Sequence, residues 1–374
     1  MGNKKPKIAI IGAGNAGCIS ALYLLDLKRK NHCNRIGEIE IHYDPNIPME
    51  RVGQGNTPLV SELLFRLLDV NWFDKNLIKA TVKTGIRYKN WGKKNHDFLH
   101  PFDNGQVACH YIPHLISKTT LNCGNFKIKE GNVKNTSEID ADYIIDCRGK
   151  HINQDEKYIN IKNPLNSALL TQKDGKRCDL LYTECVATPH GWTFVIPNHN
   201  SVSYGYLYNK NITSKKEAES DFKEKFDATP NFCLDFKNYV AKNVWDDERT
   251  ILNGNRYSFI EPLEATSTTS YAYVVEVFSQ YLNGEITKKQ VNKKIMTELG
   301  EIAQFLLQHY AGGSKYDTKF WEYAKKLSMT TKHKKYDNAM NIAKKWNHLK
   351  VNEYSFGIWG SASLKNWYDN VLND

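Results

Sequence analysis

The chain has 374 residues, 41% of them hydrophobic and 25% charged, so it can bury a large core and is not intrinsically disordered. No run reaches the roughly 18 apolar residues that a membrane span needs, and the N-terminus lacks the apolar core of a signal peptide. The net charge is +10, but the Lys and Arg residues are spread along the chain, which favours a solvated surface over nucleic-acid binding. The eight cysteines form no C-x-x-C pair, so we expect no metal site and a reducing, cytoplasmic environment.

The first informative segment is a short apolar strand that runs into a glycine-rich turn. Residues 7–11 are mostly β-branched, residues 12–17 read G-A-G-N-A-G, and apolar residues then recur at helical spacing. In this context the first glycine makes the turn, the second lets the backbone approach a pyrophosphate, and the third lets helix and strand pack closely. We therefore expect a dinucleotide site formed by Gly12, Gly14, Asn15, Ala16 and Gly17.

Later segments provide further candidates for the same site. Residues 38–44 alternate as a half-exposed strand, so Asp44 is the candidate ligand of a ribose hydroxyl, although it could also simply begin a turn before Pro45. A strand-like run over 141–149 ends at Gly149. The pair Gly254-Asn255 follows an apolar pair and precedes a helix-like stretch.

The positions of these segments predict the organisation of the chain. We expect a discontinuous cofactor-binding and sheet module over 1–290, with cofactor pieces near 7–58, 105–150 and 250–285 and substrate-facing segments between them. The pattern becomes mostly helical afterwards, so residues 291–374 are expected to form a helical cap over a substrate site.

Three motifs make the prediction more specific. Residues 83–91 read K-T-G-I-R-Y-K-N-W, residues 192–197 read W-T-F-V-I-P, and residues 261–267 read E-P-L-E-A-T-S. With the glycine loop, they resemble the flavin-dependent halogenases of the tryptophan-halogenase type, which carry K-x-x-I-x-F-x-N-W, W-x-W-x-I-P and E-P-L-E-S-T-G. The resemblance continues through 309–321 and 359–360 and so covers nearly the whole chain.

The resemblance implies a fold and an activity. The fold would be α/β, an FAD-dependent flavoprotein of the two-dinucleotide-binding-domain type with a mixed-sheet substrate region and a helical C-terminal part. The activity would be that of an oxidoreductase in which FADH2, supplied by a separate flavin reductase, reacts with molecular oxygen and a halide ion. The resulting hypohalous acid would cross a tunnel and halogenate an electron-rich aromatic small molecule.

The matched positions carry residue roles over from the family. The catalytic pair would be Lys83 and Glu264, with a halide held at Thr266 and Ser267. The cofactor site would add Gln54, Asp44, Gly149, Gly254 and Asn255 to the glycine loop. Substrate and tunnel positions would be His100, Pro101, Phe102, Trp192, Phe194, Ile196, Pro197 and Trp359.

The chain departs from the family pattern at several of these positions. Phe194 replaces the second tryptophan of W-x-W-x-I-P, and Gln54 replaces a glutamate near the flavin. The serine and glycine of E-S-T-G become Ala265 and Ser267. The chain is also shorter than tryptophan halogenases usually are, mainly in the C-terminal cap, which predicts a broad range of aromatic substrates.

Other readings of the sequence stay open at this stage. A flavin-dependent aromatic monooxygenase would share the fold, although the retained Lys83 and Glu264 argue against it. A non-catalytic, basic protein that binds FAD or nucleic acid is the alternative from another class. The sequence leaves a homo-oligomer and a carrier-tethered substrate open.

Overall fold

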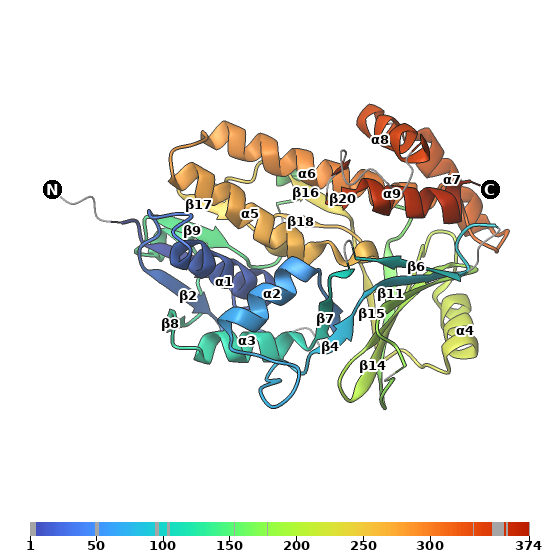
Figure 1. The fold of residues 1–374 in the computed structure, drawn as a ribbon, viewed down its shortest axis with the longest axis horizontal. Coiled ribbons are helices and arrows are strands. Elements are labelled where there is room, and N and C mark those ends of the chain that lie inside the picture. The colour runs from blue at the N-terminus through green and yellow to red at the C-terminus, as the bar shows by residue number, and fades with distance from the viewer. Residues whose placement is uncertain are drawn as a thin grey trace.

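The structure is a computed structural model that describes residues 5–48, 52–93, 97–102, 105–152, 154–177, 179–331, 333–345, 355–356 and 358–373. Two sheets dominate it, one beside the N-terminal helices and one beneath the C-terminal helices (Figure 1). None of the helices in these ranges is long and apolar enough to cross a membrane.

The first sheet is fully parallel and has five strands in the order β17-β9-β1-β2-β8. Its strands are β1 (Ile8–Ile11), β2 (Ile39–Tyr43), β8 (Lys127–Glu130), β9 (Tyr143–Asp146) and β17 (Thr250–Leu252). The central strand β1 is completely buried, as its unbroken apolar sequence predicts. Because all the strands are parallel, their carboxyl ends meet at one edge, where ligands bind in such sheets.

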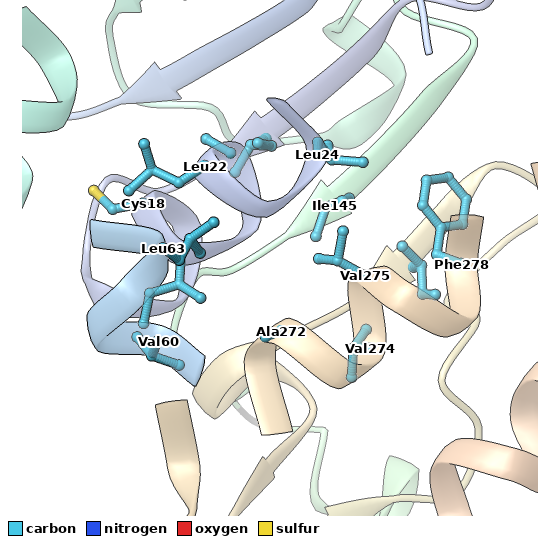
Figure 2. Close-up of a cluster of buried hydrophobic side chains, with 14 of the residues drawn as sticks. Cys18, Leu22, Leu24, Val60, Leu63, Ile145, Ala272, Val274, Val275 and Phe278 are labelled. Carbon is cyan, nitrogen blue, oxygen red and sulfur yellow. The ribbon is translucent and has the colours of Figure 1, made fainter. Parts of the chain in front are cut away.

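Helices pack against this sheet and bury its apolar side chains. They are α1 (Asn15–Arg29), α2 (Pro58–Leu67), α3 (Pro113–Asn122) and α5 (Ser267–Leu282). Figure 2 shows side chains of α1, α2 and α5 in one buried cluster, with Leu63 of α2 on the left and Val275 of α5 on the right. Lys28 and Arg29 end α1, where positive charge complements the helix dipole.

The second sheet has seven strands in the order β15-β11-β14-β13-β12-β5-β6. Only β12 and β5 pair in parallel; the other neighbours are antiparallel. The strands are β5 (Gly85–Lys89), β6 (Asp97–Pro101), β11 (Ser167–Asp174), β12 (Thr183–Thr188), β13 (Gly191–Pro197), β14 (Ser201–Tyr208) and β15 (Phe232–Asp235).

Different parts of the chain supply the helices on the two faces of this sheet. On one face, α4 (Lys215–Phe226) buries Phe222 against Tyr206. The other face carries a core rich in tryptophan and tyrosine, beneath the C-terminal helices seen in red and orange in Figure 1. Those helices are α6 (Lys288–Gln308), α7 (Lys319–Thr330), α8 (Lys334–Lys345) and α9 (Ser361–Trp367), followed by a π-helix (Tyr368–Leu372).

Short strands and turns connect the two large sheets. One small sheet contains β3 (Gln54–Gly55), β7 (Ala108–Tyr111) and β4 (Thr81–Lys83), and β4 leads directly into β5. The remaining strands are β10 (Tyr158–Asn160), β16 (Tyr239–Ala241), β18 (Ser258–Phe259), β19 (Ser355–Phe356) and β20 (Trp359–Gly360). Single 3-10 turns cover Thr136–Glu138, Asp155–Lys157, Gly254–Arg256 and Leu263–Ala265.

The predicted α/β class, with a mixed sheet and a helical C-terminal part, is confirmed. One local expectation was wrong, because Gly254-Asn255 lead into a single 3-10 turn and then strand β18 instead of a helix.

Candidate functional site

The glycine-rich loop joins β1 to α1 at the carboxyl edge of the parallel sheet. A Cβ atom at Gly17 would lie 1.8 Å from the Gly12 carbonyl oxygen, so only glycine lets the helix approach the loop this closely. A Cβ at Gly14 would meet nothing within 4 Å, so this side of the loop is open. The first backbone N–H groups of α1 have no partner within the helix, which makes this end suitable for phosphate.

The other candidate cofactor residues surround the same loop. The Asn15 Nδ2 atom donates to Gln54 Oε1 at 2.9 Å, while the buried Asn15 Oδ1 atom has no partner among the described residues. Gly254 has φ +61°, and a Cβ there would lie 2.4 Å from the Ala16 Cβ. This contact brings the turn after β17 against the start of α1.

Asp44 and Gly149 also lie beyond the carboxyl ends of strands flanking β1. Asp44 follows β2, but its Oδ1 atom accepts hydrogen bonds from the backbone and side chain of Asn46, an Asx turn. Gly149 follows β9, and its carbonyl oxygen accepts a bond from Arg256. The structure thus places Asp44 both at the expected edge and in a local turn.

Two neighbouring cavities extend from this region. The Gln54 cavity, of about 290 Å³, is lined by Gln54, Asn255, Phe194, Thr266 and Ser267 among others. The His100 cavity, of about 570 Å³, is lined by residues that include His100, Phe102 and Trp359. Both cavities are lined by Ile86 and Glu264, which therefore lie between them.

Lys83 lies beside this boundary and is completely buried at the end of β4. Its Nζ atom donates to the Asn56 carbonyl oxygen at 3.0 Å and lies 5.3 Å from the centre of the Phe102 ring. A Cβ at Gly55, which lines the Gln54 cavity, would lie 3.2 Å from the same Nζ atom. Burial lowers the pKa of Lys83 to about 8, although attraction to Glu264 opposes the shift.

The Glu264 carboxylate is held by side chains from four other elements. Its Oε1 atom accepts bonds from the Tyr88 hydroxyl, from His100 Nδ1 at 3.1 Å and from His309 Nε2 at 3.0 Å. Its Oε2 atom accepts a bond from Trp359 Nε1 at 3.1 Å. Burial raises the pKa of Glu264, but the charges and hydrogen bonds of the two histidines outweigh burial and hold that pKa well below its usual range.

The backbone at Glu264 and Ala265, which line the Gln54 cavity, is strained. Glu264 and Ala265 adopt φ values of +68° and +54°, which non-glycine residues rarely do. Helix α5 begins two residues later, so its first N–H groups, next to Thr266 and Ser267, point out of the helix end. Consecutive free N–H groups and a helix N-terminus form an environment suited to an anion.

Strand β13 forms the buried wall of the Gln54 cavity. Trp192, Phe194 and Ile196 line it, and Pro197 ends the strand. Trp192 Nε1 donates to Glu261 Oε2 at 3.1 Å, and the Tyr310 hydroxyl donates to the same oxygen at 2.6 Å. Burial raises the pKa of Glu261 to about 7, against the hydrogen bonds it accepts.

The candidate substrate residues gather at the His100 cavity. His100 and Pro101 line it from the end of β6, Phe102 follows that strand, and Trp359 lines the cavity from β20. His100 is 5% exposed, and its Nε2 atom contacts the Ser363 hydroxyl, so both ring nitrogens are occupied by protein.

Sequence reasoning missed three polar residues of this centre: Tyr88, His309 and Glu261. The signal for Tyr88 was available, because a tyrosine stands where the motif K-x-x-I-x-F-x-N-W has phenylalanine. Its hydroxyl is the group that reaches Glu264. Glu261 and His309 stand in segments that resemble the family, but the sequence assigned them no role, since their partners are far away in the chain.

The glycine loop, the two cavities and the buried Lys83 and Glu264 at their boundary are features expected of an α/β enzyme with a dinucleotide cofactor. A family model described as tryptophan halogenase matches residues 7–118 and 114–366. The chain therefore belongs to the tryptophan halogenase family, a family of flavin-dependent enzymes.

Individual relatives are distant in sequence but similar over most of their length. Tryptophan 7-halogenase RebH from Lentzea aerocolonigenes is 22% identical over 435 residues, covering 88% of this chain and 80% of that protein. The solved tryptophan 6-halogenase SttH from Streptomyces toxytricini has a TM-score of 0.78 at 18% identity, covering 98% of this chain and 90% of that one. BrvH, a flavin-dependent halogenase from Brevundimonas sp. BAL3, has the same TM-score at 16% identity, covering 98% and 90%. At these identities the structural similarity establishes the fold.

Proposed function

We propose that this chain halogenates an electron-rich aromatic small molecule with FADH2, molecular oxygen and a halide ion. The balanced reaction is FADH2 + O2 + X⁻ + H⁺ + ArH → FAD + ArX + 2 H2O, in which the flavin and the halide are oxidised and oxygen is reduced. The chemistry that FADH2 would supply when bound is the formation of hypohalous acid from oxygen and the halide. The chain's own residues bind the reactants, direct the oxidant and remove the ring proton.

The residues around the glycine loop fit FAD. The open side of Gly14 and the N-terminus of α1 would receive the pyrophosphate, and the unpartnered Asn15 Oδ1 atom is available to a ligand donor. Gln54, Gly149, Gly254 and Asn255 would line the rest of the site, with Asp44 as the ribose ligand. The discontinuous module over 1–290 and the helical cap over 291–374 are part of the same proposal.

The halide would bind at the start of α5. The N–H groups next to Thr266 and Ser267 are donors that the helix itself does not use, and they open into the Gln54 cavity. Binding there would hold the anion on the same side of Glu264 as the flavin. The Trp192, Phe194, Ile196 and Pro197 wall would keep bulk water and the substrate away from the flavin.

Lys83 and Glu264 would act where the two cavities meet. The Lys83 ammonium would donate a hydrogen bond to the hypohalous acid and so orient its electrophilic halogen towards the ring. The ionised Glu264 would stabilise positive charge as it develops on the ring and then accept the ring proton. A low pKa does not prevent this step, because a halogenated ring cation is a far stronger acid than a carboxylic acid.

The observation that carries the proposal is the location of Glu264 between the two cavities, with the buried Lys83 beside that boundary. The test is an assay with a flavin reductase, NADH, oxygen and each halide against phenols, anilines and indoles, read by mass spectrometry. We expect halide-dependent product over a broad panel from the wild type. Lys83→Ala is expected to retain FAD and lower product formation at least about a hundredfold, the scale of a positioned proton donor.

The control variants separate function from folding. Lys83→Met keeps the buried stem without the amine and should be as inactive as Lys83→Ala, whereas replacing the exposed Lys118 of α3 by alanine should change nothing. Halogenation by Lys83→Ala near the wild-type rate would refute the role of Lys83. Hydroxylated products that form without halide would identify a monooxygenase instead.

A further inference from the structure

The described lining of the His100 cavity contains carboxylates but no lysine or arginine. The two carboxylates are Glu62 and Glu264, and Glu264 is already bonded by His100 and His309. Of the cations close by, Arg66 pairs with Asp26, and Lys83 is buried with its Nζ atom bonded to Asn56. Glu62 is therefore the anionic group that the described lining offers to a ligand.

The exposure of the lining residues indicates where the ligand enters. Glu264, His100 and Trp359 are at most 9% exposed and form the closed end. Leu59, Val107 and Ile358 are 46%, 45% and 37% exposed and lie at the solvent side. Glu62 is one helical turn from Leu59 on α2, and its side chain is 70% exposed. An aromatic ring seated at the closed end would therefore direct its substituent past apolar side chains towards Glu62.

We propose, on the basis of the halogenase function above, that this cavity selects aromatic substrates that carry an amine but no free carboxylate, with Glu62 as the specificity residue. A substrate ammonium would pair with Glu62, whose interaction with Arg66 is loose at 3.8 Å. A substrate carboxylate would instead be repelled by Glu62, and the described lining holds no lysine or arginine to pair with it. The free amino acid tryptophan carries both an ammonium and a carboxylate. Its ammonium would be attracted to Glu62, whereas its carboxylate would be disfavoured in the cavity.

The test uses four substrates with the same indole ring, so that ring reactivity is matched and side-chain charge varies. They are tryptamine, 3-methylindole, tryptophan and indole-3-propionate, assayed for halogenation with a flavin reductase and compared by kcat/KM. We expect tryptamine to be the best substrate, roughly two- to fivefold above 3-methylindole, the size of one exposed ion pair. Indole-3-propionate is expected to be the worst.

Variants at Glu62 connect the preference to this residue. Glu62→Gln should make tryptamine and 3-methylindole equal, and Glu62→Lys should raise indole-3-propionate above tryptamine. The matched control is Glu219→Gln on α4, which removes another surface carboxylate in an i,i+4 pair, here with Lys215, and should leave the order unchanged. FAD retention and thermal unfolding verify that each variant is folded.

The outcomes distinguish this inference from the proposed function. A wild-type preference for tryptophan or indole-3-propionate, equal rates for all four indoles, or an unchanged order in Glu62→Gln would overturn the inference while halogenation still stands. Failure to halogenate any of the four, with no hypohalous acid trapped in solution, would overturn the proposed function itself.

Discussion

Lys83 is a buried cation whose location costs stability. It is 0% exposed, and its recorded contacts are one carbonyl oxygen and one aromatic ring. Burial lowers its pKa from the ordinary value of 10.5 to about 8, because the charged form loses its hydration. Polar groups that destabilise the fold are typical of functional sites, where such a cost is balanced by activity.

The lowered pKa predicts how the stability of a Lys83→Met variant depends on pH. Below pH 8 the lysine is charged in both the folded and the unfolded chain, so the wild type bears the full penalty. Between pH 8 and 10.5 only the unfolded chain holds the proton, so wild-type stability rises with pH. The stability advantage of Lys83→Met should therefore be largest at pH 7 and shrink by at most about 3 kcal/mol towards pH 10.5.

Denaturant unfolding of the cofactor-free wild type and variant across this pH range would measure the effect. Lys118→Met on α3 is the control, because it makes the same substitution at an exposed lysine. A stability difference at Lys83 that stays constant from pH 7 to 10.5 would show that the folded chain does not lower this pKa.

At the scale of elements, the turn before α5 connects the cofactor side of the molecule to the reactive centre. Its Glu264 and Ala265 both adopt positive φ, and α5 follows immediately. This conformation turns the Glu264 side chain towards His100 and His309 and keeps the helix N-terminus beside the Gln54 cavity. The left-handed conformation costs an L-residue about 1–2 kcal/mol, so the turn depends on its surroundings.

The strain predicts that Ala265→Gly will stabilise the protein. Glycine adopts positive φ without the Cβ clash, and its extra freedom in the unfolded chain offsets only part of the gain. We expect the free energy of unfolding to rise by about 0.5–1 kcal/mol, measured by denaturant titration. Ala272→Gly within α5 is the matched control, and its loss of helix propensity and packing should lower stability.

At the scale of the whole molecule, the candidate functional site lies where the five-stranded parallel sheet and the seven-stranded mixed sheet meet. The parallel sheet provides the glycine loop, the seven-stranded sheet provides β5, β6 and β13, and the C-terminal helices close the far side. A short sheet containing Lys83 and Gln54 lies between them. This arrangement gives the proposed cofactor and the proposed substrate separate cavities that share one boundary.

The same architecture predicts that flavin reduction takes place elsewhere. The chain has one G-x-G-x-x-G fingerprint, which the proposed FAD site uses, so no second loop is available for NADH. We expect the purified protein with FAD to oxidise NADH no faster than free FAD does, as followed by the absorbance of NADH. Adding a flavin reductase should start both NADH oxidation and halogenation; rapid oxidation without it would refute the prediction.

The sequence by itself determined the parts of this protein that are encoded locally. A strand, a glycine turn and a helix are contiguous, so residues 7–25 were sufficient to predict the dinucleotide loop. Lys83, Glu264 and the β13 wall could be predicted as site residues because each stands in a short motif that resembles the family's. Such motifs can be recognised in the sequence because the backbone that they form involves only neighbouring residues.

The tertiary structure alone decided the electrostatics of the site. Glu264 is bonded by His100, 164 residues away, and by His309, 45 residues away, so no short window of sequence contains the groups that lower its pKa. The lowered pKa of Lys83 and the position of Glu62 on the solvent side of the His100 cavity likewise depend on which distant elements cover them. Burial and charge proximity are properties of the packed molecule, because they arise only when separate segments exclude water from the same volume.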